Sequence, residues 1–142
     1  MSSSGATIDG NVNVEQNAQF AAFTGSTIGR NVHCNQCEVA DVQDSTVKGN
    51  QLDNGVSEGA FIRNSHIFGN LQIHHGTDFF ATGFHIDGNT IGGNLQFNQN
   101  TGLSDISGNT VTGNLQCHNN MPPPTGAGNT ARQQQGQCAL LF

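Results

Sequence analysis

The chain has 142 residues, the size of a single domain, and only 10% of them are charged, against about 25% in ordinary globular domains. Its net charge is −6, and its four cations, Arg30, Lys48, Arg63 and Arg132, are far apart in the sequence, which excludes a basic surface for nucleic acid. No apolar run approaches the roughly 20 residues of a membrane helix, so we expect no membrane insertion.

An eight-residue motif recurs along the whole chain, as in the segments 90–97 and 110–117. Aligned on the residue after its first position, the copies place a small or apolar residue every 19 to 24 positions, at Ile8, Ile28, Val47, Ile67, Ile91, Val111 and Ala131. A period of about 20 residues indicates a solenoid, in which each repeat buries its apolar side against the next. The periodicity therefore overrides the disorder that the modest hydrophobicity alone would suggest.

Apolar and polar residues alternate within each copy, as in Val12-Asn13-Val14 and Leu95-Gln96-Phe97, which is typical of a β-strand. A second half-pattern, such as Phe20 and Phe23 before Gly25-Ser26, completes each repeat. We predict an all-β fold: a right-handed parallel β-helix of about seven coils, each with three short strands. We expect one domain over 1–142, with a flexible segment at 1–5, regular coils over 7–120 and an irregular last coil and apolar tail over 121–142.

A column of asparagines lies three residues beyond the aligned apolar position. Its members are Asn11, Asn31, Asn50, Asn70, Asn94 and Asn114, followed by Gln134. Amides stacked at coil spacing can hydrogen-bond one to the next, so we expect a structural ladder. The glycines before most of them (Gly10, Gly49, Gly69, Gly93 and Gly113) are expected to supply a positive φ at the corner.

The middle of the chain departs from the repeat. In Gln51-Leu52-Asp53 an inward carboxylate is unfavourable, so we expect a local shift that turns Leu52 inward. The fourth coil has about four extra residues near 77–82, and insertions in solenoids leave as loops, often on the binding face. Phe79 and Phe80 on this loop can form an exposed contact patch, although the simpler expectation is that one of them packs beneath the loop.

The C-terminal segment lacks the strand pattern. Met121-Pro122-Pro123-Pro124 stands where a strand is due, and proline cannot donate to a β-ladder. Leu140, Leu141 and Phe142 are expected either to cap the open end of the solenoid or to plug into a neighbouring molecule.

The four cysteines favour an oxidising compartment. Cys117 and Cys138 are about one coil apart, so their Cα atoms are expected within disulfide reach. For Cys34 and Cys37 a local disulfide or free thiols are favoured, because a zinc site needs two more ligands and a redox motif needs a helix start. We expect a secreted or cell-surface protein whose signal peptide has been removed, since Met1-Ser2-Ser3-Ser4-Gly5 looks like a start codon fused to a trimmed chain.

The reactive side chains are scattered. His74 and His118 share an outward column but lie two coils apart, and no pair of carboxylates repeats at the spacing of glycoside hydrolysis. Neither a nucleophile elbow nor a phosphate-binding loop occurs. We therefore predict no catalytic residues, no metal site and no cofactor, and a protein that is not an enzyme.

The Gly-Asn repeat and the ending, Gly113-Asn114-Leu115-Gln116-Cys117 with Gly136-Gln137-Cys138, resemble a family of small secreted bacterial proteins. These proteins are built of Gly-Asn β-helix repeats and end in a similar cysteine-containing signature. The resemblance implies secretion and a β-helix, and it implies no catalytic residues. The chain also looks loosely like bactofilins, the polymerising β-helices of the bacterial cytoskeleton, although its coil is longer and it carries cysteines.

Two functions from different classes follow. The first is a non-catalytic structural solenoid that joins copies of itself end to end, into fibres or a surface layer. The second is an adhesin-like module that binds a polysaccharide or cell surface through Gln72, Gln96 and Gln116, despite the absence of Trp and Tyr. A polysaccharide-active enzyme is less favoured, and so is an ice-binding protein that would use Thr7, Thr27, Thr46, Thr90, Thr110 and Thr130.

Overall fold

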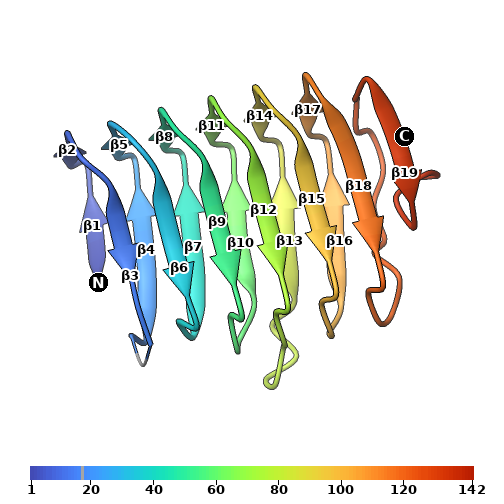
Figure 1. Ribbon diagram of the computed structural model, residues 1–142, viewed down its shortest axis with the longest axis horizontal. Helices are drawn as coiled ribbons and strands as arrows, with labels where there is room; N and C mark the ends of the chain where they lie inside the picture. The colour runs from blue at the N-terminus through green and yellow to red at the C-terminus, as the bar shows by residue number, and fades with distance from the viewer. Residues whose placement is uncertain (17) are drawn as a thin grey trace.

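The computed structural model describes residues 1–16 and 18–142, and these residues form strands, turns and bends with no helix. No helix among them could therefore cross a membrane. The chain winds as a right-handed parallel β-helix of about seven coils, with its two termini at opposite ends of the rod (Figure 1). The predicted fold class is confirmed.

Three parallel sheets run along the rod, and consecutive strands enter them in turn. Sheet A contains β1 (Ser2–Ser4), β4 (Phe20–Thr24), β7 (Val39–Gln43), β10 (Ala60–Arg63), β13 (Phe84–Asp87) and β16 (Ser104–Ser107). Sheet B contains the two-residue strands β2 (Thr7–Ile8), β5 (Thr27–Ile28), β8 (Thr46–Val47), β11 (His66–Ile67), β14 (Thr90–Ile91) and β17 (Thr110–Val111). Sheet C contains β3 (Val12–Val14), β6 (Val32–Asn35), β9 (Gln51–Asn54), β12 (Leu71–His74), β15 (Leu95–Asn98), β18 (Asn114–His118) and β19 (Gln133–Gly136).

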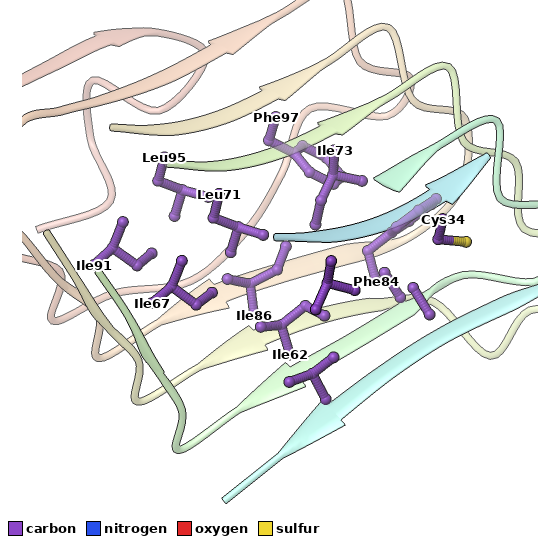
Figure 2. Packing of buried hydrophobic residues seen from close by; sticks show 14 of the residues in the cluster. Cys34, Ile62, Ile67, Leu71, Ile73, Phe84, Ile86, Ile91, Leu95 and Phe97 are labelled. Atoms are coloured by element: carbon purple, nitrogen blue, oxygen red, sulfur yellow. The ribbon is translucent and has the colours of Figure 1, made fainter. Parts of the chain in front are cut away.

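The core is a stack of like side chains, because each strand pairs in register with the strand one coil away. Leu71 of β12 pairs with Leu95 of β15, and Ile67 of β11 pairs with Ile91 of β14. All four are fully buried, and Figure 2 shows them following one another along the interior. Each such side chain contributes roughly 1.5–3 kcal/mol relative to an exposed position. The alternation in the sequence therefore becomes one continuous apolar seam.

The corner between sheets B and C holds the predicted asparagine ladder. From Asn31 to Asn114, each backbone N–H donates to the side-chain Oδ1 of the preceding asparagine, over 2.8–3.1 Å. Gln134 does not continue this column, because Gln133 pairs with Asn114 and Gln134 with Leu115. The last corner lacks a Gly-Asn pair and turns with one residue fewer than the others.

The glycines that precede these asparagines have a different role from the one expected. None of the five has a positive φ, so that prediction is wrong. Instead, a Cβ at Gly69, Gly93 or Gly113 would overlap the Oδ1 of the asparagine one coil below. The glycines are required for close approach of the coils. In the second coil Arg30 takes the place of glycine in this column. The ladder bond beside it, from Asn31 N–H to Asn11 Oδ1, is 3.1 Å long, whereas the others are 2.8 Å.

Two further polar columns lie inside the rod, and the sequence pattern did not predict that they are buried. At the corner between sheets A and B, the column begins with Ser26, Ser45 and Ser65 and continues with Asn89, Asn109 and Asn129, all buried. Asn89 Nδ2 donates to the carbonyl oxygen of Ile62 over 2.6 Å and to Asn109 Oδ1 over 3.0 Å. Asn100 and Asn120 form an equivalent buried pair at the corner between sheets C and A. These columns satisfy backbone groups that turn away from the ladders.

The third coil carries a buried polar pair, and the shift predicted there is wrong. Asp53 and Gln51 point inward with no exposed surface, while Leu52 faces outward. The register with Cys34 on one side and Ile73 on the other holds this orientation, since a one-residue slip would turn every side chain of β9 over. Gln51 Nε2 donates to Asp53 Oδ2 over 2.9 Å, and Asp53 Oδ1 has no partner.

The two ends of the rod differ. The sequence predicts a flexible segment over 1–5. In the structure Ser2–Ser4 form β1, which pairs with β4 and so extends sheet A by one strand. At the other end, β16 is the last strand of sheet A among the described residues, and a bridge from Asp105 to Thr125 extends the sheet past the prolines. Leu141 is buried, and its carbonyl oxygen accepts hydrogen bonds from Asn129. Leu141 therefore caps the last coil, while Leu140 and Phe142 are exposed.

The close approach of glycine to the amide ladder predicts a position-specific cost. We expect Gly93→Ala to lower the free energy of unfolding by about 1–3 kcal/mol, because the new methyl group overlaps Asn70 Oδ1 and neighbouring backbone. Gly10→Ala is the matched control, since a Cβ there meets nothing within 4 Å. Urea unfolding measures both variants, and equal stabilities would contradict the role of close packing.

Burial of Asp53 predicts a stability that depends on pH. Burial raises the pKa of Asp53 from 3.8 to about 7, and the hydrogen bond from Gln51 opposes this rise. The protonated form is favoured in the folded state, so its contribution is complete below about pH 4 and is lost as the pH rises to about 7. The free energy of unfolding should fall across this range by at most ~1.4 kcal/mol per pH unit.

The Asp53→Asn variant should lack this decline and should exceed the wild type in stability at pH 7, because it carries no titrating group there. Urea unfolding at pH 4, 5.5 and 7 measures the difference between wild type and variant. Asp9→Asn, at an exposed carboxyl, is the control and should retain the decline. Parallel curves for wild type and Asp53→Asn would show that the buried carboxyl does not set the pH dependence.

Candidate functional site

The inserted segment of the fourth coil projects from the corner between sheets C and A, at the bottom of the rod in Figure 1. Asp78 organises this loop, which connects β12 to β13. Its Oδ1 accepts from the backbone N–H of Thr82 over 2.9 Å, and its Oδ2 accepts from the N–H of Gly83 over 3.0 Å. The Thr82 hydroxyl donates in turn to the carbonyl oxygen of Glu58 over 2.6 Å. The loop is therefore tied to itself and to the coil below.

Both aromatic side chains of this loop face solvent. Phe79 is 77% exposed and Phe80 is 69% exposed, so the expectation that one of them packs beneath the loop is wrong. Asp78 accounts for this, because its carboxylate occupies the inner side of the turn with hydrogen bonds to Thr82 and Gly83. Two adjacent exposed phenylalanines are held there on an ordered turn, and large exposed apolar groups of this kind mark contact sites.

A groove of about 450 Å³ lies beside the loop, on the outer side of sheet A. Its apolar part comes from Ala81 of the loop, from Leu103 and from Pro122 and Pro123 of the last coil. Gly83 directly precedes β13, where the Phe84 N–H donates to the Leu103 carbonyl oxygen over 2.9 Å, and both Gly83 and Leu103 line the groove. Leu103 is 64% exposed and forms a wall. The volume lies within the 300–1,000 Å³ of small-molecule sites.

Three polar side chains lie beside these apolar groups. His85, Asp105 and Thr125 line the groove, and they follow one another in register across β13, β16 and the last coil. His85 Nε2 lies 3.2 Å from the carbonyl oxygen of Thr82, which only accepts, so Nε2 carries a proton in this contact. The Thr125 hydroxyl donates to the carbonyl oxygen of Ser104 over 2.8 Å. The Asp105 carboxylate accepts from the Ser107 hydroxyl.

Next to the groove, the outer face of sheet A carries a pair of charged side chains, Arg63 and Asp87. Arg63 Nε lies 3.4 Å from Asp87 Oδ2, and both side chains are about one third exposed, at 36% and 33%. The Arg63 guanidinium lies 5.3 Å from the ring centre of Phe61, which stacks on His85 at 5.6 Å. Partial burial and the neighbouring Asp105 raise the pKa of Asp87, while Arg63 and His85 oppose that rise.

The glutamines predicted to bind sugars lie on sheet C and bond to one another. Gln72 donates to Gln96 over 2.9 Å, Gln96 to Gln116 over 3.1 Å, and Gln116 to Gln135 over 2.9 Å. They are half-buried; Gln96 and Gln116 each use one amide proton and the amide oxygen in this ladder, and Gln72 uses one amide proton. The face is therefore flat and largely self-satisfied, which makes it a weaker binding surface than the groove.

The histidines of the same face stay apart. His74 and His118 are in one column with Asn98 between them, as the repeat predicts. Partial burial and the neighbouring His75 lower the pKa of His74. Across residues 1–16 and 18–142, no group of three or more His, Cys, Asp or Glu side chains is arranged to hold a metal ion.

The threonine column lies on sheet B, whose strands have only two residues each. His66 interrupts it between Thr46 and Thr90, and its ring stacks on Phe68 with centres 4.2 Å apart. The column therefore lacks the continuous regular surface that an ice-binding face requires.

Both cysteine pairs are at disulfide distance. The Cα atoms of Cys117 and Cys138 lie 5.2 Å apart and those of Cys34 and Cys37 lie 5.8 Å apart, within the range that disulfides adopt. All four are buried, so they act as staples of the core rather than as accessible reagents. Two such pairs are compatible with an extracellular location.

Comparison of the chain with protein-family models, with curated proteins and with solved structures gives no match. The resemblance to secreted Gly-Asn-repeat proteins and to bactofilins therefore remains a prediction from the motifs. The site itself is partly visible in the sequence, through the extra length of the fourth coil. Asp78, His85 and Asp105 were missed, because single polar residues in a solenoid give no sign of the neighbours that the winding brings to them.

Proposed function

We propose that this protein is a non-catalytic β-solenoid that binds a surface polysaccharide, as a secreted or cell-surface component. The observation that carries the proposal is the groove, which is lined mainly by apolar side chains such as Leu103 and Pro123, with the polar groups of His85, Asp105 and Thr125 beside them. A sugar ring has this same division, with an apolar face of C–H groups and a rim of hydroxyls. The match in chemistry favours a glycan over a purely apolar or purely charged ligand.

The loop strengthens this proposal. Phe79 and Phe80 are largely exposed on a turn that four hydrogen bonds of Asp78 hold in place. Little conformational entropy is therefore lost when a ligand covers them. Phenylalanine can supply the stacking surface for sugars that Trp and Tyr commonly provide, and the chain contains neither of those. A rigid rod with one ordered aromatic loop is suited to presenting a contact rather than to chemistry.

The proposal predicts binding that depends on the loop. On a glycan array, the wild-type protein should bind a subset of polysaccharides, and titration calorimetry with those glycans should give measurable affinities. Phe79→Ala together with Phe80→Ala should weaken binding by about tenfold, which corresponds to ~1.4 kcal/mol. Phe68→Ala removes an exposed phenylalanine from a different corner and should bind as the wild type does. Absence of binding to every glycan would count against the function.

Self-association is the second candidate function. In this chain the outer edges of β1, β2 and β3 have no strand paired to them among the described residues, and such edges are templates for pairing with another copy. The last coil differs, because Leu141 is buried at its corner between sheets A and B and accepts a hydrogen bond from Asn129 there, while the outer edge of β19 has no strand paired to it among the described residues. This difference favours two first coils meeting in a closed dimer over a head-to-tail fibre.

Light scattering of the 142-residue chain over a range of concentrations tests this candidate. We expect the mass to rise from that of one chain, 14.9 kDa, toward that of two. Electron micrographs at the same concentrations distinguish a dimer from a fibre. A constant mass of one chain up to high concentration would remove self-association from the candidates.

A further inference from the structure

The three polar side chains of the groove present acceptors rather than donors. The Asp105 carboxylate has only acceptors, the His85 Nε2–H is directed at the carbonyl oxygen of Thr82, and the Thr125 hydroxyl donates its hydrogen bond to the carbonyl oxygen of Ser104, which leaves the Thr125 oxygen as an acceptor. A ligand that contacts these side chains must therefore bring hydrogen-bond donors.

The charge of the groove points the same way. Asp105 is the one carboxylate among the described residues that line the groove, and none of those residues is lysine or arginine. Asp105 also lies next to Asp87, whose charged form it disfavours. Arg63 is the cation close to this pair and is already engaged with Asp87 at 3.4 Å. A cation that enters the groove at Asp105 would offset a local excess of negative charge on a chain whose net charge is −6.

We infer that the groove selects a glycan that bears free amino groups, such as a chain of de-N-acetylated amino sugars, and that Asp105 determines this specificity. An ammonium group has three donors and no acceptor, which complements the Asp105 carboxylate and the Thr125 hydroxyl oxygen. The C–H face of the same sugar would lie against Leu103 and Pro123. The inference rests on the proposed glycan-binding function, since it names the class of glycan for that groove.

Three oligosaccharides of equal length test the inference by titration calorimetry at low salt. These are a glucosamine oligomer, its N-acetylated counterpart and a neutral glucose oligomer. The glucosamine oligomer should bind at least tenfold more tightly than the other two, and this advantage should shrink as the salt concentration rises. Asp105→Asn should reduce its affinity about tenfold and should leave the neutral oligomer unchanged.

Asp41→Asn is the matched control, because it removes the same charge from the same outward column of sheet A, two coils from His85. It should leave the advantage of the glucosamine oligomer intact. A thermal melt of each variant verifies that both remain folded.

The failures are distinguishable. Equal affinities for the three oligomers, or equal effects of Asp105→Asn and Asp41→Asn, would overturn the choice of an amino glycan while the groove stays a glycan site. No binding of any oligomer, together with an empty glycan array, would overturn the proposed function and this inference with it.

Discussion

The hydrogen bond from each corner asparagine to the side chain of the asparagine one coil earlier is the interaction on which the stacking depends. It joins a backbone N–H to an amide oxygen over 2.8–3.1 Å, and it recurs from Asn11 to Asn114. A single exposed bond of this kind contributes only about 0.5–1.5 kcal/mol. Its larger effect is on register, because the amide can meet its partner only when successive corners lie directly above one another. The glycines beside the ladder leave the space that this approach requires.

Once the register is fixed, the coils have little freedom to vary except where the chain leaves the rod. The insertion between β12 and β13 uses that freedom. Asp78 anchors it, and Ala81 and Gly83 of the loop line a groove together with Pro122 and Pro123 of the last coil. A loop held on a rigid scaffold is where binding residues are most often found. The same scaffold brings His85 and Asp105, twenty residues apart, next to each other in the groove.

The core also contains a polar pair that lowers the stability of the fold. Gln51 and Asp53 replace apolar residues in the third coil, and an oxygen of each is buried without a partner. Burial of this kind lowers stability compared with an apolar pair of similar volume. The register leaves the pair no alternative, since turning Leu52 inward would move Gln51 and Asp53 outward and displace their neighbours along β9. Local preference gives way here to the pairing of whole strands.

The sequence by itself determined the repeat, the parallel β-helix, the asparagine ladder and the spacing of Cys117 and Cys138, because each of these follows from a period of about 20 residues. It did not determine which way Asp53 points, why glycine precedes the asparagines, or that Phe79 and Phe80 are both exposed. Those outcomes depend on what lies one coil above and below, at atomic distance. Periodicity specifies which residues share a column, but only the tertiary structure decides how closely two columns approach and what fills the space between them, since that is set by packing.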